Sequence, residues 1–225
     1  MIPTVPHPRR PLDRRDPSDP VRQWYENELG WATVPGAPVR LVTGLRFDVL
    51  DVPAEAGYAV LRRHMRPGTG SPVALHTGRP TRGERMRFLV APGSADELPG
   101  LLDWLEWGAL TLDLRAIGAG GSIEAPGPPD LGTSQGAGSA GACSPVSPGA
   151  GPPLTSPQGA AVWLRPPEPG CEVESSLPTM SALPALSAVG GGGGAPDLVR
   201  LVDTMATQCH RVRLRRVCAQ PLAFS

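Results

Sequence analysis

Hydrophobic and polar residues alternate in several short segments of the first 165 residues, and a period of two is typical of strands with one buried face. In Phe47–Val52 two aspartates interrupt the hydrophobic residues, and we expect a central strand that carries Asp51 to its C-terminal end. The pattern predicts these strands: Val39–Val42, Phe47–Val52, Pro72–Thr77, Arg85–Ala91, Leu110–Arg115, Ser122–Ala125 and Ala160–Arg165.

Between these segments hydrophobic residues recur every three or four positions, as they do on one face of an α-helix. N-cap residues, prolines in the first turn and a C-terminal glycine mark the helix ends. We expect helices between an Asp19 N-cap and Gly30, from Pro53 to about His64, and after an N-cap at Ser94. This order matches neither a doubly wound fold nor a sandwich, so the pattern predicts an α+β domain with a mixed or antiparallel sheet and packed helices.

A last helix is predicted from Asp197 to about Val212, with Pro196 near its first turn. Its hydrophobic side chains share one face: Leu198, Leu201, Val202, Met205, Cys209 and Val212. A hydrophobic face of this kind has to be buried. We expect it to pack on the sheet of the same domain, and the alternative is that it binds a partner protein.

Glycine and proline gather in segments that have few large hydrophobic residues to offset the entropy of ordering. The chain contains 28 glycines and 29 prolines. We expect this organisation: a disordered arm at 1–18, a domain at 19–165 with a disordered insert at 127–159, a flexible linker at 166–195, a C-terminal helix at 196–216 and a tail at 217–225.

The charges balance, since 21 basic residues, all of them arginine, face 21 acidic residues. A formal net charge of zero excludes the strongly basic field of a protein that coats nucleic acid. Four arginines nevertheless crowd the end of the last predicted helix: Arg211, Arg213, Arg215 and Arg216. Two interpretations stay open: they bind nucleic-acid phosphates, or they form a solvated helix end that the helix dipole stabilises.

The four cysteines show no CxxC spacing, which argues against a zinc site or a disulfide framework. The N-terminal residues lack the apolar core of a signal peptide, and no apolar run approaches the roughly 18 residues that span a bilayer. We therefore expect a cytoplasmic protein without membrane contact.

Three segments carry residues suited to phosphate chemistry: FDVLDVPAEAG at 47–57, LHTGRPTRGERMRFLV at 75–90 and LDLRAIGAGGSIEAPGPP at 112–129. Each is weak alone, because an aspartate after a strand often forms a turn and a glycine cluster often forms a hairpin. Asp51 could also cap the helix that follows it.

In this order and spacing the segments resemble the primase–polymerase (Prim-Pol) domain found at the N-terminus of bifunctional DNA primase/polymerases, in the archaeo-eukaryotic primase superfamily. Residues 30–35, GWATVP, are similar to the Gly-Trp-x-Val-x-Pro strand of that family. Thr43-Gly44 and Val49-Leu50-Asp51 resemble its Thr-Gly and Val-Leu-Asp-x-Asp strand, and Gly57 lies in the helix that follows.

Two later motifs of the family extend the resemblance, and Trp163 is similar to an aromatic residue of its closing strand, so that the resemblance covers about residues 20–165. The Thr-x-x-Gly-x-His-x-x-Phe hairpin of the family resembles residues 77–90. Its Asp-x-Arg-x-x-Gly-Gly-x-x-x-x-Pro segment is similar to a set of residues here: Asp113, Arg115, Gly120, Gly121 and Pro126.

The resemblance implies binding of a nucleoside triphosphate and of DNA or RNA, with Mg²⁺ or Mn²⁺ held by carboxylates for nucleotidyl transfer. It implies that Asp51, Asp113 and Arg115 are catalytic, the two aspartates as metal ligands and the arginine at a phosphate. The further nucleotide contacts that we expect are His76, Arg79, Arg85, Gly120 and Gly121.

Two positions depart from the pattern of the family. Pro53 stands where the second acid of Asp-x-Asp would be, and Met86 falls at the hairpin histidine. Neither side chain supplies an oxygen or nitrogen ligand, so we expect a nucleotide- or nucleic-acid-binding protein with impaired or lost transfer. The alternative is a non-enzymatic regulatory module that keeps the fold and binds DNA or a partner protein.

Overall fold

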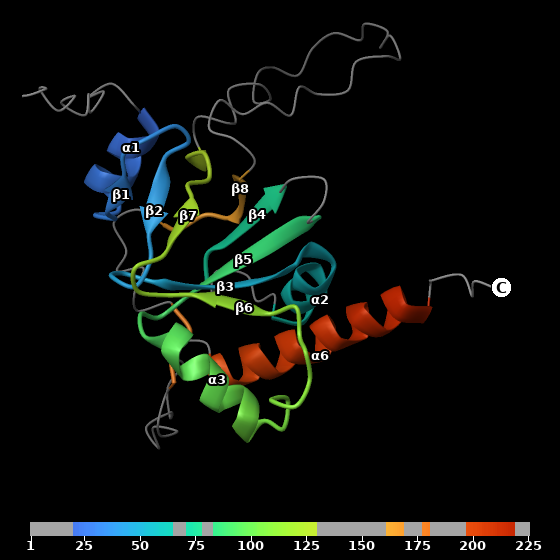
Figure 1. Cartoon of the computed structure of the whole chain (residues 1–225). Helices are drawn as coiled ribbons and strands as arrows, with labels where there is room; N and C mark the ends of the chain where they lie inside the picture. Colours follow the sequence, from blue (N-terminus) through green and yellow to red (C-terminus); the bar gives the residue numbers. More distant parts are fainter. Residues whose placement is uncertain are drawn as a thin grey trace, which may run out of the picture.

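Two antiparallel sheets lie at the centre of the structure, a computed structural model that describes residues 20–64, 71–77, 83–129, 161–168, 177–180 and 197–218 (Figure 1). The larger sheet has the order β6 (Arg115–Ile117), β3 (Asp48–Pro53), β5 (Glu84–Val90), β4 (Val73–Thr77) and β8 (Ala161–Arg165). The smaller sheet has the order β1 (Thr33–Val34), β2 (Arg40–Val42) and β7 (Ser122–Glu124). This is the α+β, antiparallel architecture that the sequence predicts.

Strand β3 is buried on both faces, and its residues alternate between two cores. Leu50 and Val52 face a core shared with α2 (Ala54–His64), α3 (Ser94–Trp104) and α6 (Leu198–Cys218). Val49 faces a second core, shared with the smaller sheet, α1 (Pro20–Gln23) and the π-helical turn η1 (Trp24–Glu28). Because successive side chains on a strand point to opposite faces, Asp51 lies on the same face as Val49.

The hydrophobic face predicted for the last helix is confirmed, and it packs within this domain. All of its predicted residues are buried, from Leu198 to Val212, against α2, α3 and β3. The Asp197 carboxylate accepts a hydrogen bond from the Val199 amide (2.9 Å) and caps the helix. The helix is longer than predicted, and Figure 1 shows its C-terminal end extending beyond the neighbouring elements. No helix in the described part of the chain is long and apolar enough to cross a membrane.

The strand predicted at Leu110–Arg115 is wrong in its position. Pairing with β3 begins only at Arg115, opposite Asp51, and runs to Ile117. Leu110 is exposed, whereas Leu112 and Leu114 pack against the first core from an irregular segment. The alternation of hydrophobic residues here therefore reflects packing on that core and not membership of the sheet.

The N-cap predicted at Ser94 is also wrong. Ser94 is the first residue of α3, and the N-cap is Gly93 in a left-handed conformation (φ 90°), which provides no capping side chain. The Asp48 carboxylate, from β3, instead accepts a hydrogen bond from the Ala95 amide (2.9 Å). A carboxylate at this helix end is favourable because the first amides point toward it.

Most of the glycine- and proline-rich segments lie outside the part of the chain that the structure describes. The arm at 1–18 lies outside the described residues, as do the insert at 127–159 except for 127–129 and most of the linker at 166–195. Within that linker, Leu177 is buried in the second core, and the Pro178 carbonyl accepts a hydrogen bond from the Ala91 amide (2.9 Å). The linker is therefore anchored to the domain at this point, because Leu177 fills a hydrophobic position.

Gly57 of α2 is required by the close approach of β5. A Cβ at this position would lie 2.6 Å from Met86 Cβ and 2.5 Å from its Sδ. We expect Gly57→Ala to lower the free energy of unfolding by about 1–3 kcal/mol, because the clash outweighs the gain in helix propensity. Gly100→Ala, in α3 with no atom within 4 Å of its Cβ, is the matched control and should stabilise by at most about 1 kcal/mol. Urea unfolding of both variants measures the difference, and equal stabilisation would contradict this packing.

Candidate functional site

Arg85 of β5 binds Asp51 of β3 on the face of the larger sheet that turns toward the smaller sheet. Its Nε lies 2.9 Å from Asp51 Oδ1, and its Nη2 donates to the Asp51 main-chain oxygen (3.0 Å). Asp51 is only 8% exposed. A carboxylate this deeply buried needs a partner, and Arg85 supplies it.

The same guanidinium also reaches Asp113, which lies just before β6. Arg85 Nη1 donates to Asp113 Oδ1 at 2.7 Å, so that one arginine joins the two aspartates. Burial alone would lower the pKa of Arg85, but its contacts with Asp113 and Asp51 outweigh this effect and raise the pKa. Arg115 lies at the edge of the group, with its Nε 4.0 Å from Asp113 Oδ1. The structure thus brings together Asp51, Asp113 and Arg115, the residues predicted to be catalytic.

Arg87 completes the arginine–carboxylate cluster, which we define as Asp51, Arg85, Arg87, Asp113 and Arg115. It stands opposite Asp51 in the β3–β5 ladder. Its Nε and Nη1 are buried and have no hydrogen-bond partner among the described residues. Burial lowers the pKa of Arg87, although the charges of Asp51 and Glu124 oppose the shift. The sequence signal for Arg87 was its spacing of two from Arg85, which puts both side chains on one face.

His76 of β4 lies on the same face but is turned to the smaller sheet. It is opposite Arg85 in the ladder, and its Nε2 lies 3.1 Å from Glu124 Oε2 of β7. Nearby, Arg40 of β2 donates from Nε to Ser122 Oγ (3.0 Å). His76, expected at a nucleotide, is thus engaged with a carboxylate of the smaller sheet.

Met86 is not at the site. The expectation that Met86 occupies the position of the hairpin histidine of the family is therefore corrected. Its side chain is fully buried in the first core, on the opposite face from Asp51 and against Gly57 of α2. The pattern Gly-x-His-x-x-Phe also fits Gly83-Glu84-Arg85-Met86-Arg87-Phe88, one residue earlier. In that register the histidine position is Arg85, which faces Asp51 and Asp113.

The cluster does not fit a divalent cation as it stands. Both aspartates accept hydrogen bonds from Arg85, so the positive charge of its guanidinium already lies between the two carboxylates. Pro53, two residues after Asp51 on the same face, provides no ligand. Over the described ranges, no three His, Cys, Asp or Glu side chains lie close enough to hold a metal ion. The guanidinium removes the repulsion between carboxylates that a metal would otherwise relieve.

Gly120 and Gly121, predicted at a phosphate, lie beyond the other end of the β3–β6 ladder. The Gly121 amide donates to the Gly118 carbonyl (3.0 Å), and the Gly121 carbonyl accepts from the Thr43 amide (3.2 Å). The loop also packs closely on Gly44 (φ 89°), where a Cβ would lie 2.3 Å from Ala119 Cα. These glycines therefore form a hairpin that joins the two sheets, and the structure does not bring them to the cluster.

The remaining residues that the sequence predicts to bind phosphate are Arg79 and the four arginines of α6. Arg79 lies outside the described residues. The four C-terminal arginines of α6 do not share one side of the helix: Arg213 and Arg216 line a groove with Asp113 and Arg115, whereas Arg211 and Arg215 line another with Glu55 of α2.

A family model for the N-terminal domain of bifunctional DNA primase/polymerases (Prim-Pol) matches residues 1–138, which include every residue of the cluster and exclude β8 and α6. No curated protein and no solved structure matches the chain. The match covers more than half of the 225 residues, and the motifs that carry the resemblance lie within it. The chain therefore belongs to the family of bifunctional DNA primase/polymerase N-terminal domains.

Proposed function

We propose that the arginine–carboxylate cluster binds the phosphates of a nucleotide ligand directly through arginine, without metal-dependent nucleotidyl transfer. The observation that carries this proposal is Arg87, whose guanidinium has two buried nitrogens without a hydrogen-bond partner among the described residues. The family provides the ligand class, since Prim-Pol domains act on nucleotides and nucleic acids.

Arg87 has more hydrogen-bonding capacity than its surroundings use. A buried charged group without hydrogen bonds costs several kcal/mol, so it is normally paired. Asp51 stands opposite Arg87 in the ladder, but its carboxylate accepts a hydrogen bond from Arg85 Nε instead (2.9 Å). Once neighbouring side chains move to admit it, an anion from solution would satisfy the free nitrogens of Arg87, and a phosphate matches the planar fork of a guanidinium.

The same arrangement disfavours catalysis by metal ions. Nucleotidyl transfer depends on cations that bridge the triphosphate and neutralise the developing charge. Here Arg85 holds the two aspartates that would bind such ions, with contacts of 2.9 Å to Asp51 and 2.7 Å to Asp113. A metal would have to displace a charge-assisted contact that is favourable as it stands.

A second candidate function is metal-dependent transfer with weakened metal affinity. It is favoured by the convergence of Asp51 and Asp113 on one guanidinium. On this alternative Mg²⁺ or Mn²⁺ would bind these carboxylates after Arg85 moved aside, with Arg115 at a phosphate.

We expect Arg87→Gln to weaken ATP binding by about tenfold or more, equivalent to about 1.4 kcal/mol or more, because the phosphate loses a charged bidentate partner. Isothermal titration calorimetry measures the affinity. Arg200→Gln is the matched control, since Arg200 is an exposed arginine of α6 away from the cluster. Arg87→Gln should keep the resistance of the wild type to urea, because the buried Nε and Nη1 of Arg87 make no hydrogen bond that the fold would lose. Unchanged ATP binding in Arg87→Gln would overturn the proposal.

A further inference from the structure

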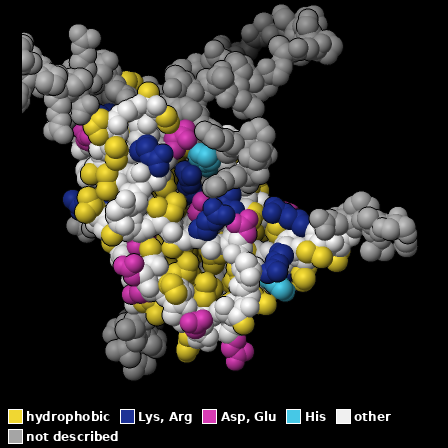
Figure 2. All heavy atoms as spheres, in the orientation of Figure 1, with side chains coloured by type: hydrophobic (Ala, Val, Ile, Leu, Met, Phe, Trp, Pro, Cys, Tyr) yellow, Lys and Arg dark blue, Asp and Glu magenta, His cyan; other side chains and the backbone are white. Residues whose placement is uncertain are grey.

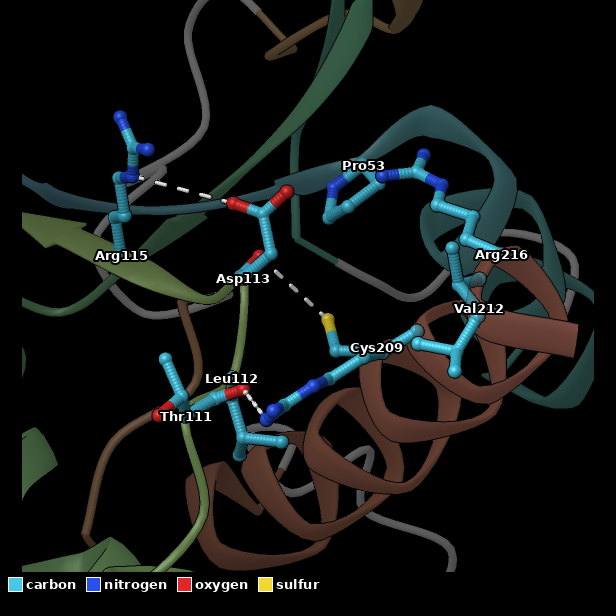
Figure 3. A pocket seen from close by; sticks show the side chains of 10 residues that line it. Pro53, Thr111, Leu112, Asp113, Arg115, Cys209, Val212 and Arg216 are labelled. Carbon is cyan, nitrogen blue, oxygen red and sulfur yellow. Dashed lines mark hydrogen bonds and ion pairs between the residues drawn. The ribbon is translucent and has the colours of Figure 1, made fainter. Parts of the chain in front are cut away.

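A groove lies between α6 and the irregular segment that leads into β6. It has a volume of about 510 Å³, and we call it the α6 groove. Asp113 and Arg115 line one wall, Arg213 and Arg216 line the other, and Leu112 and Val212 contribute hydrophobic surface. Figure 3 shows Arg115 and Arg216 on either side of Asp113. The groove thus combines three arginines with one carboxylate, and that carboxylate already binds Arg85.

The arginines of the groove keep most of their donors free. Arg216 makes no hydrogen bond or ion pair within the described residues, and Arg213 donates from Nη1 to the Thr111 carbonyl (2.6 Å). Arg115 is 59% exposed and reaches Asp113 only at 4.0 Å. Burial raises the pKa of the Cys209 thiol to about 12, so this residue adds no negative charge to the groove. The groove is therefore a positive site with unused donors.

We propose that the α6 groove binds the phosphodiester backbone of single-stranded nucleic acid, next to the arginine–carboxylate cluster. The inference rests on the proposed function, because Asp113 and Arg115 belong to both the groove and the cluster. Figure 2 shows separate groups of dark-blue side chains from the middle of this face toward α6, with magenta side chains among them. A strand that places one phosphate at Arg87 would extend its neighbouring phosphates toward the α6 groove.

The shape and surface of the groove favour a single strand over a duplex. Its volume lies within the roughly 300–1,000 Å³ typical of pockets for small ligands, which is more than a lone phosphate needs. A flexible strand can turn its backbone to arginines and an unstacked base to hydrophobic side chains or a guanidinium plane. In a duplex the bases are stacked inside and only the phosphates could approach.

The opposite side of α6 offers an internal control. Arg211 and Arg215 lie on the same two turns but face α2, and Arg215 Nη2 is paired with Glu55 Oε1 at 2.8 Å. Neither residue lines the α6 groove. Replacing this pair removes the same charge from the same helix segment while leaving the groove unchanged.

The test compares Arg213→Gln/Arg216→Gln with Arg211→Gln/Arg215→Gln by fluorescence anisotropy of a labelled oligodeoxythymidine over a range of salt concentrations. We expect the groove variant to weaken binding by about tenfold and to reduce the salt slope by about 1.4, since each lost phosphate contact on a single strand contributes about 0.7. The control pair should change binding by less than about threefold. Arg213→Lys/Arg216→Lys should keep most of the affinity, which excludes a folding defect.

Equal losses of oligonucleotide binding in the two Gln variants would show nonspecific attraction to α6 and would overturn the proposed role of the groove. Unchanged binding in Arg213→Gln/Arg216→Gln would overturn it as well. ATP affinity separates this inference from the proposed function. Arg213→Gln/Arg216→Gln should leave ATP binding intact, whereas Arg87→Gln should weaken it. Loss of oligonucleotide binding in the groove variant together with unchanged ATP binding in Arg87→Gln would support the groove and overturn the proposed function alone.

Discussion

Replacing Arg85 with alanine is expected to lower the free energy of unfolding by about 3–5 kcal/mol, the cost of breaking a buried ion pair from one side. Asp51, which is only 8% exposed, would lose the contacts that Arg85 Nε and Nη2 provide. The loss of the contact with Asp113 would contribute less to this destabilisation, since the Asp113 side chain is 41% exposed and water can replace the lost donor. Urea denaturation at neutral pH, followed by circular dichroism, measures the change.

Two further variants show whether the loss arises from the buried pair. Arg85→Met combined with Asp51→Asn removes both charges and should recover most of the stability, so that a double-mutant cycle gives a large coupling energy. Arg115→Ala is the control for an exposed arginine of the cluster and should cost less than about 1 kcal/mol. Similar losses in Arg85→Ala and Arg115→Ala would show that Arg85 does not hold Asp51 in the folded state.

Restoring two residues of the family pattern is expected to create a metal site. Pro53 is the ladder partner of Arg85 and lies on the same face as Asp51. In Pro53→Asp/Arg85→His the guanidinium is gone, and three carboxylates and an imidazole surround the same space. Oxygen and nitrogen ligands of this kind suit Mn²⁺. Without metal this variant should be less stable than the wild type, because its carboxylates repel one another.

Mn²⁺ should therefore raise the melting temperature of Pro53→Asp/Arg85→His in a concentration-dependent manner, since a ligand that binds only the folded state stabilises it. Pro53→Asp alone keeps Arg85 and is the matched control; it should show little stabilisation by Mn²⁺. A response of the same size in the single and double variants would mean that Arg85 does not prevent metal binding.

The sequence predicted the β3 and β5 strands of the site, because short runs of hydrophobic residues with polar interruptions are typical of strands. The alternation of Phe47–Val52 placed Asp51 at the end of a central strand, and the spacing of Asp113 and Arg115 matched the family motif. The structure has Asp51 opposite Arg115 in the ladder, and Arg85 joins both aspartates. The functional roles of these residues remain predictions.

The parts that the sequence did not predict depend on contacts between distant segments. Arg85 and Met86 are neighbours on one strand, and only the pairing with β3 shows which of them faces Asp51. The cap of α3 comes from Asp48, 47 residues before the amide it binds. Leu177 looked like part of a linker because its neighbours are polar or small, yet it fills the second core. Each case joins residues that no local pattern relates.

The most direct test of the central claim, that the Arg85 guanidinium takes the place of a metal ion, is a Mn²⁺ titration of the unmodified chain followed by electron paramagnetic resonance of free Mn²⁺. Pro53→Asp/Arg85→His serves as the positive control, and Asp51→Asn/Asp113→Asn removes both carboxylates. We predict that the wild type binds no more Mn²⁺ than Asp51→Asn/Asp113→Asn does, while the positive control binds one ion per chain. Binding of one Mn²⁺ by the wild type that is lost in Asp51→Asn/Asp113→Asn would contradict the claim and favour metal-dependent transfer.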